Sequence, residues 1–374
     1  MFSRRLGEVV AVSSKWGECE VLEVICEEKL TQALNYVPLT GRADVGDYVM
    51  LNTTAVELGL GTGGLHFVCL NLTRPEANSQ EPGHIMKLRY TPQQVRVLAV
   101  EEEASPYHGI MKEASSLMGM PVIVAELHSM LAPTAIALKQ KKPDVRLAYL
   151  MTDGGALPAF FSKTVYALKK SGFICGTITA GHAFGGDLEA VNVYSGLLAA
   201  KQVLHADAVI ICMGPGVVGT GTPFGFSGLE LGDNLNRAAV LGGRPIAVPR
   251  ISFADRRPRH RGLSHHTLTA LTVAALVSAD LPLPVLDEEK NAYLQQQITA
   301  KGLAEKHAVY TYEGLTLSVL AGNEDLCRTM GRSLTEDPDF FLAVVAAAHH
   351  TALILEQKLM DLPVKECTQS HLPW

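Results

Sequence analysis

The chain has 374 residues, of which 47% are hydrophobic and 19% are charged, so it can bury a sizeable core and is expected to divide into two or more globular domains. With 32 basic and 38 acidic residues the net charge is −6, which excludes a general attraction to nucleic acid or to an anionic membrane surface. The seven cysteines form no Cys-x-x-Cys pair and most lie in apolar runs, so we expect a reduced, cytoplasmic protein.

Residues 1–93 are predicted to form a small, barrel-like β domain. Short runs with β-branched or alternating character are separated there by turn signals such as Lys15-Trp-Gly17. We interpret Gly59–Gly64 as a hairpin turn, although a glycine-rich loop could also bind an anion. A loop is expected at Asn78–Gly83, with Lys87–Tyr90 as the last strand of the domain. The other predicted strands are Gly7–Val12, Glu20–Cys26, Tyr48–Leu51 and Leu65–Asn71.

Residues 94–374 are predicted to form a Rossmann-like α/β domain, a doubly wound and mostly parallel sheet with a helical C-terminal part. Strands that are apolar throughout alternate with helical patterns, which is typical of a parallel sheet covered on both faces. Beyond residue 270 the clearest helices are Asp287–Lys301 and Asp339–Gln357. The predicted strands are Val95–Val100, Pro121–Ala125, Arg146–Met151, Phe173–Thr179, Ala208–Met213 and Pro245–Val248, with a further strand at His307–Tyr312.

The apolar stretches Leu268–Ala279 and Phe340–Ala348 fall short of the roughly 20 residues that span a bilayer. We therefore expect no membrane segment.

Ligands of open parallel sheets bind beyond the carboxyl ends of the strands, and the polar residues of this chain gather there in the sequence. Glu126 and His128 follow one predicted strand, Asp153 follows the next, and His182 comes after a third. If the sheet is parallel, one edge brings carboxylates, imidazoles, glycine loops and arginines together.

The segment Gly181-His-Ala-Phe-Gly-Gly-Asp187 is the first catalytic candidate. His182 could act as a general base oriented by Asp187, or both could bind a metal ion. The alternative is that Asp187 caps a helix predicted over Ala190–His205 and that His182 is an ordinary loop residue. Asp153 resembles the acid at the end of a Mg²⁺-binding strand, yet Thr-Asp-Gly-Gly is also a common turn.

A glycine-rich run follows the predicted strand Ala208–Met213, and it is the main candidate for ligand binding. Glycines packed this densely let the backbone turn its N–H groups toward an anion. The Gly-x-Gly-x-x-Gly pattern fits a dinucleotide site in form only, because Pro215 occupies the tight turn and no helix follows at once. The run holds the binding candidates Gly214, Gly216, Gly219, Gly221 and Thr222.

The segment Arg250–Arg261 concentrates arginines in an otherwise acidic protein. Arginine side chains suit phosphate or carboxylate groups, so we expect Arg250, Arg256 and Arg257 to neutralise an anionic ligand. The alternative is a solvated or subunit-interface loop. We interpret His265-His266, which follow Ser264, as the start of a helix rather than as metal ligands, and His349-His350 as structural.

The combination of Gly181-His-Ala-Phe-Gly-Gly-Asp187, Gly214-Pro-Gly-Val-Val-Gly-Thr-Gly-Thr-Pro223 and Ser264-His-His266 resembles an uncharacterised bacterial family, domain of unknown function 3866. The resemblance covers nearly the whole chain and implies a bacterial, cytoplasmic protein. It supplies no activity and no established catalytic residues.

The residues themselves favour an enzyme, a hydrolase or group transferase, that binds a phosphorylated or nucleotide-like anionic small molecule. His182, Asp187 and Asp153 are the catalytic candidates. The alternative is a protein that senses a metabolite or assembles without turnover. The sequence leaves the cofactor and any metal unidentified and leaves homo-oligomerisation open, and it predicts no nucleic-acid or membrane partner.

Overall fold

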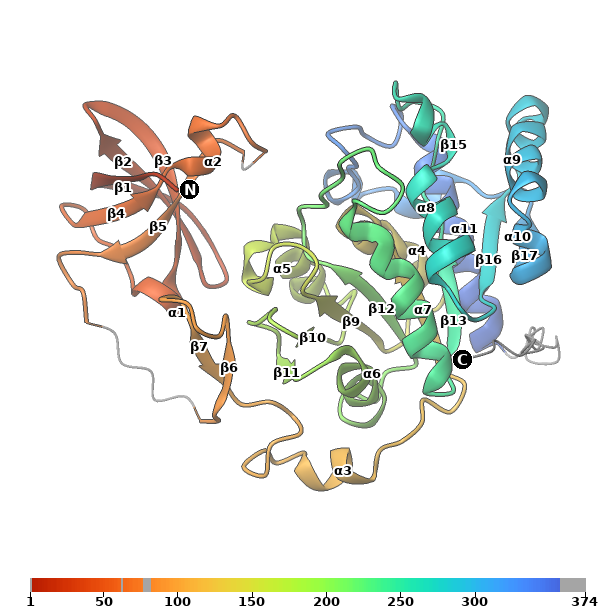
Figure 1. The fold of residues 1–374 in the computed structure, drawn as a ribbon, viewed down its shortest axis with the longest axis horizontal. Helices are drawn as coiled ribbons and strands as arrows, with labels where there is room; N and C mark the ends of the chain where they lie inside the picture. Colours follow the sequence, from red (N-terminus) through yellow and green to blue (C-terminus); the bar gives the residue numbers. More distant parts are fainter. Residues whose placement is uncertain (1, 62, 77–81, 357–374) are drawn as a thin grey trace. The chain divides into compact units, whose positions relative to one another are not determined.

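The computed structural model describes residues 2–61, 63–76 and 82–356. The chain separates into two compact units, Met1–Arg96 and Val97–Trp374, which are described one at a time (Figure 1). Most of the loop expected at Asn78–Gly83, and the end of the helix expected to reach Gln357, lie outside the described residues.

Five strands of the first unit close into a barrel in the order β1-β2-β3-β5-β4. Neighbouring strands are antiparallel except β3 and β5, which run parallel. Val9, Leu22 and Leu51 are completely buried inside it. The elements are β1 (Arg4–Trp16), β2 (Cys19–Cys26), β3 (Lys29–Tyr36), α1 (Val37–Thr40), β4 (Tyr48–Asn52), α2 (Thr54–Glu57) and β5 (Leu65–Asn71).

The predicted last barrel strand is wrong. The strand β6 (Ile85–Lys87) pairs with β7 (Val95–Val97) in a separate two-stranded sheet. The barrel closes instead through β3, a strand that the sequence analysis did not predict. Its sequence, Lys-Leu-Thr-Gln-Ala-Leu-Asn-Tyr, contains few β-branched residues, and pairing with β2 along its whole length compensates for that weak propensity.

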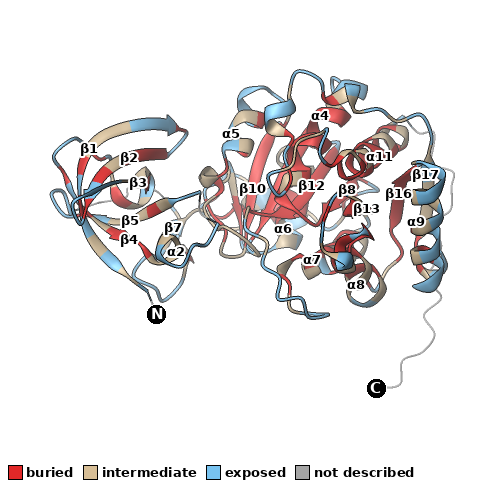
Figure 2. Ribbon diagram, turned by 90° about the horizontal axis from the view of Figure 1, so that it is seen from above, coloured by how far each residue is buried: buried red, intermediate tan, exposed pale blue. Residues whose placement is uncertain are grey.

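The second unit is built on an eight-stranded sheet in the order β11-β10-β9-β12-β8-β13-β16-β17, with every neighbouring pair parallel. Its central strands are buried along their whole length (Figure 2), which explains why they are apolar throughout. The α/β fold class is confirmed. The strands are β8 (Pro121–Ala125), β9 (Leu147–Thr152), β10 (Gly176–Ala180), β11 (Leu188–Ala190), β12 (Ala208–Met213), β13 (Arg244–Val248), β16 (Asp280–Pro284) and β17 (Ala308–Tyr312).

Helices cover both faces of this sheet and enclose one apolar core on each. On one face α4, α5 and α11 share a core with Ile123, Tyr149 and Ile210. On the other face α6, α7 and α9 pack with Leu150 and Ile211. The helices are α3 (His108–Glu113), α4 (Leu131–Lys141), α5 (Lys163–Lys170), α6 (Val193–Gln202), α7 (Glu230–Val240), α8 (His265–Thr269), α9 (Glu288–Ala300), α10 (Leu303–Lys306) and α11 (Pro338–Leu355).

Two strands of the sheet were not predicted from the sequence. The short strand β11 occupies the first residue of the helix expected over Ala190–His205, so α6 begins later, at Val193, with Asn192 as its cap. The strand β16 reads Asp-Leu-Pro-Leu-Pro. Because proline donates no hydrogen bond to a neighbouring strand, β16 pairs with β13 at a single position while pairing fully with β17.

The helix α11 is longer than the apolar stretch singled out in the sequence. By length and composition alone it could cross a membrane, but 72% of it is buried inside the structure. Its side chains contribute to the core shared with α4, so it packs as a core helix of the second unit.

The connection that follows β12 crosses a different face of the sheet from the connections that follow both of its neighbours, β9 and β8. It leads to α7 on one face, whereas β9 and β8 lead to α5 and α4 on the other. In open α/β sheets, ligands bind beyond the carboxyl ends of the strands at such a change of face. We call this edge of the sheet the rim.

Candidate functional site

Asp153 and His182 meet at the ends of two adjacent strands, β9 and β10. The backbone N–H of His182 donates a hydrogen bond to Oδ2 of Asp153 at 3.0 Å. Asp153 is exposed and His182 is half-buried. The parallel sheet therefore brings together two of the three residues selected as catalytic candidates.

Asp187 lies at the other end of β10. Its carboxylate accepts hydrogen bonds from the backbone N–H and the hydroxyl of Thr177 at 2.8 and 2.9 Å, and it also pairs with Lys169 at the end of α5. Burial raises the pKa of Asp187, but the hydrogen bonds from Lys169 and Thr177 lower it further, to a value below the ordinary one. Since Thr177 is near the start of β10 and His182 follows its end, Asp187 does not orient His182; it ties β10 to α5.

Glu230, which the sequence analysis did not select, is the first residue of α7 and lies beside Asp153. Its Oε1 accepts a hydrogen bond from the Thr152 hydroxyl at 2.6 Å, and a Cβ atom built on Gly154 would come within 2.7 Å of its Oε2. Burial raises the pKa of Glu230 to about 7 against the lowering effect of Thr152, and the charge of Asp153 adds to the rise. We call Asp153, His182 and Glu230 the carboxylate cluster.

Residues 214–225, which we call the glycine loop, begin with a glycine needed for close packing. A Cβ atom on Gly214 would lie 2.3 Å from the carbonyl oxygen of Ala156, and one on Gly155 would lie 2.3 Å from that of Gly214. The N–H of Ala156 also donates a hydrogen bond to Pro215. The loops after β9 and β12 are therefore in direct backbone contact, and Gly214 is explained by that contact.

The rest of the glycine loop is open to solvent. Gly216 and Gly221 adopt positive φ angles of 109° and 80°, which other residues rarely adopt. The Thr222 hydroxyl accepts a hydrogen bond from the N–H of Gly225 at 3.0 Å and so shapes the tip. Within residues 82–356, the N–H groups of Gly216, Gly219 and Gly221 have no hydrogen-bond acceptor.

The glycine loop faces the arginine-rich segment and one histidine. A Cβ atom on Gly221 would lie 3.9 Å from Nη1 of Arg259, and one on Gly219 would lie 3.2 Å from Cε1 of His266. The ring of Phe226, just after the loop, stacks on His266 with centroids 4.0 Å apart and planes 4° apart. The loop after β12 thus lies against the segment that follows β13.

Two of the three selected arginines form ion pairs with the same aspartate. Asp255 pairs with the buried Arg250 at 3.1 Å and with Arg257 at 2.8 Å, and the hydrogen bond from Arg257 holds the pKa of Asp255 far below its usual range. Arg256 and Arg259 are exposed and form no ion pair with any residue that the structure describes. The free positive charge beside the glycine loop therefore belongs to Arg259, which the sequence analysis did not single out.

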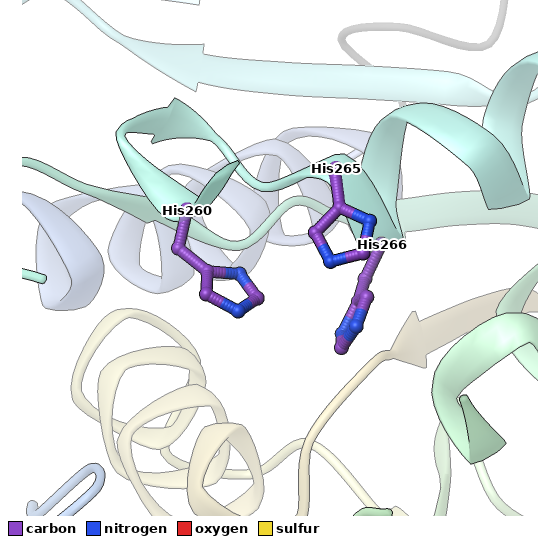
Figure 3. A group of neighbouring side chains, drawn as sticks. All are labelled: His260, His265 and His266. Carbon is purple, nitrogen blue, oxygen red and sulfur yellow. The ribbon is translucent and has the colours of Figure 1, made fainter. Parts of the chain in front are cut away.

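Three histidines converge in the same segment, and Figure 3 shows their rings next to one another. His260 lies in a hairpin formed by β14 (Ile251–Ser252) and β15 (Gly262–Leu263), and the prediction that His265 begins a helix is confirmed. Each ring offers one nitrogen, and these nitrogens lie within 4.8 Å of one another. We call His260, His265 and His266 the histidine cluster.

Polar side chains on neighbouring elements contact the histidine cluster. The Ser264 hydroxyl lies 2.8 Å from Nδ1 of His260 and caps α8 by accepting the N–H of His266. Glu126, at the end of β8 and only 1% exposed, has its Oε1 3.4 Å from Nδ1 of His266. Its other oxygen accepts the Thr267 hydroxyl at 2.6 Å.

Burial lowers the pKa of two of the three imidazoles, those of His260 and His265. Burial lowers the pKa of His260 to about 3, and the charges of Arg250 and Arg257 add to this effect. Burial also lowers the pKa of His265, as does the neighbouring His266. A neutral imidazole keeps a lone pair, so these residues could hold a metal ion.

Comparison with curated proteins and with solved structures gives no match to this chain. Comparison with protein-family models gives one match, to the family described as a protein of unknown function, DUF3866, over residues 32–348. That span includes the carboxylate cluster, the glycine loop and the histidine cluster, together with most of β3 and all of β4 and β5 of the barrel. The chain therefore belongs to the DUF3866 family of proteins of unknown function.

Proposed function

We propose that this protein is an enzyme, a hydrolase or group transferase, that binds a phosphorylated or nucleotide-like anionic small molecule at the rim. The observation that carries the proposal is the glycine loop, whose N–H groups lack hydrogen-bond partners within the described residues. The loop follows β12, where the connecting helices change from one face of the sheet to the other, and it lies close to Arg259, which forms no ion pair with the described residues. Backbone N–H groups and an arginine side chain are the donors that phosphate groups prefer.

The structure changes the roles that the sequence analysis gave to the arginines. Arg250 and Arg257 already share Asp255, so in this proposal they fix the shape of the segment. Arg259 makes the direct contact with the anion, and the exposed Arg256 adds long-range attraction. Gly216, Gly219 and Gly221 supply the N–H groups.

The carboxylate cluster supports proton transfer beside that anion. Glu230 is held by Thr152 and lies next to Asp153, and a carboxyl group with a pKa of about 7 exchanges protons efficiently near neutrality. In this proposal Glu230 takes the general acid–base role first assigned to His182 and Asp187. Asp153 and His182 position the reacting group at the ends of β9 and β10.

Thermal denaturation with inorganic phosphate or ADP tests the binding step. We expect both to raise the Tm of the wild-type protein, and Arg259→Gln to weaken the apparent affinity roughly 10- to 150-fold, since hydrogen bonds to charged groups contribute roughly 1.5–3 kcal/mol. Lys170→Gln removes an exposed charge from the last turn of α5 and serves as the matched control. A Tm that neither anion raises would remove the main support for the proposal.

Phosphate release from a panel of phosphate esters tests the catalytic step. We expect Glu230→Gln to abolish release while protection by inorganic phosphate persists, because the substitution keeps the shape of the side chain and removes its proton exchange. Protection by anions without release from any ester is the result that the metabolite-sensing alternative predicts.

A further inference from the structure

We propose that His260, His265 and His266 bind one transition-metal ion, with Zn²⁺ as the preferred ion. The three rings come from two short segments, the β14–β15 hairpin and the start of α8. His260 and His266 are buried and His265 is half-buried. In the described part of the chain no other group of histidine, cysteine and acidic side chains converges in this way.

The spacing of the rings suits a shared ion. The ring centroids lie 5.1 Å apart for His260 and His265, 5.0 Å for His260 and His266, and 4.2 Å for His265 and His266. Imidazoles bound to one tetrahedral zinc, with Zn–N distances of about 2.0–2.1 Å, have centroids roughly 5 Å apart. The three observed spacings, 4.2 to 5.1 Å, are therefore close to the spacing expected around one ion.

The surroundings of two rings bear on which nitrogen faces the ion. Ser264 occupies Nδ1 of His260, which leaves Nε2 of that ring for the ion. Nδ1 of His266 lies 3.4 Å from Oε1 of Glu126 but forms no hydrogen bond within the described residues. A carboxylate or hydroxyl behind a histidine is the usual way in which proteins orient a metal ligand. Nε2 of His265 is buried and has no hydrogen-bond partner within the described residues, as expected of a nitrogen that binds a metal ion.

The donor set determines the class of ion. Three imidazoles without a thiolate suit Zn²⁺ and other divalent ions late in the first transition series, whereas Mg²⁺ and Ca²⁺ require oxygen ligands. Three protein ligands leave the fourth tetrahedral position for water or a substrate atom. Glu126 and Asp255 contribute negative charge that offsets the nearby arginines.

An ion in the histidine cluster would add a cation to the anion site proposed above. Gly219 lies against His266, so a cation in the histidine cluster would stand next to an anion held by the glycine loop. This link to a phosphate-bearing ligand rests on the proposed function. The metal site itself stands on the three histidines alone.

Metal uptake by the full-length protein tests the inference. The purified protein is stripped with a chelator, dialysed against Zn²⁺ and analysed for bound metal, and competition with a chromogenic chelator gives the affinity. We expect one equivalent of zinc for the wild type and at least a hundredfold weaker binding for His260→Gln, His265→Gln and His266→Gln. His349→Gln, in α11, is the matched control and should bind zinc as the wild type does.

Two further measurements keep the test independent of folding defects. We expect Glu126→Gln to weaken zinc binding about 10- to 100-fold, as removal of an outer partner usually does. X-ray absorption of the zinc-loaded wild type should show three imidazole ligands. Zinc uptake well below one equivalent in the wild type, undiminished uptake in all three histidine variants, or a spectrum without imidazole ligands would overturn the proposal.

Zinc uptake is measured without any anion, and protection by phosphate is measured again on the stripped protein. A protein that binds phosphate but no zinc leaves the glycine loop proposal standing and removes this one. A protein that binds zinc but no phosphate leaves the metal site standing and removes the glycine loop proposal.

Discussion

The carboxylate cluster and the histidine cluster lie at the same edge of one sheet, yet they are built differently. Asp153 and His182 follow directly from the ends of β9 and β10, and Asp153 is exposed. The histidine cluster is carried by a hairpin and a short helix inserted after β13, and two of its rings are buried. The first cluster depends on the sheet for its position, whereas the second depends on polar side chains packed around it.

This difference predicts unequal sensitivity to the loss of a carboxylate. Glu126→Ala should lower the free energy of unfolding by about 3 kcal/mol, because it opens a cavity and leaves the buried Thr267 hydroxyl without its acceptor. Asp153→Ala should cost less than about 1 kcal/mol, since water can replace an exposed carboxylate. Urea unfolding curves measure both values, and equal losses would contradict the contrast between the two clusters.

The pH dependence of stability tests the carboxylate cluster through Glu230. Because the pKa of Glu230 is raised from an ordinary value of 4.5 to about 7 in the folded protein, the folded state binds the proton more tightly than the unfolded state between those pH values. The contribution of Glu230 to stability therefore falls as pH rises from about 4.5 to 7 and stays low above that range, the total change being on the order of 3 kcal/mol.

The variant Glu230→Gln carries no such titration and isolates this effect. The difference in unfolding free energy between the variant and the wild type should shift in favour of the variant as pH rises through this window. Urea unfolding at several pH values measures the shift. A difference that stays constant with pH would show that the carboxyl of Glu230 is solvated like an ordinary surface glutamate.

A smaller effect distinguishes the hydroxyl groups of the two loops. Ser264→Ala removes the cap of α8 and the partner of His260 at a buried position, and we expect a loss of about 1–2 kcal/mol. Thr222→Ala removes a hydrogen bond at the exposed tip of the glycine loop and should cost less than about 0.5 kcal/mol. Thermal denaturation of the two variants gives the comparison, and a larger loss for Thr222→Ala would reverse it.

The sequence predicted what depends on local pattern. The apolar strands β8, β9, β12 and β13 and the turn-rich barrel follow from composition and spacing, and their parallel arrangement placed Asp153 beside His182. It did not predict β11, because three residues carry too little periodicity. Nor did it show that Asp187 returns to the start of β10, since that depends on pairing between distant backbone groups.

The parts of the candidate site that sequence reasoning missed are those formed by long-range contacts. Glu230 reads as an ordinary acidic residue in the first turn of a helix until burial against Thr152 is known. His265-His266 read as a helix start, which they are, and only the hairpin that returns His260 to them reveals the cluster. One signal was present: three histidines and a serine within seven residues, 260–266, are unusual for a solvated loop.

The connection between β10 and β11 has a consequence for motion at the rim. Parallel neighbours usually need a long crossover, but here residues 181–187 suffice, and Asp187 and Glu189 fasten the segment to the adjoining strands. A segment anchored this way opens only at high cost. The glycine loop, by contrast, is exposed and forms its hydrogen bonds mainly within itself, so of these two segments it is the one that can open at the lower cost.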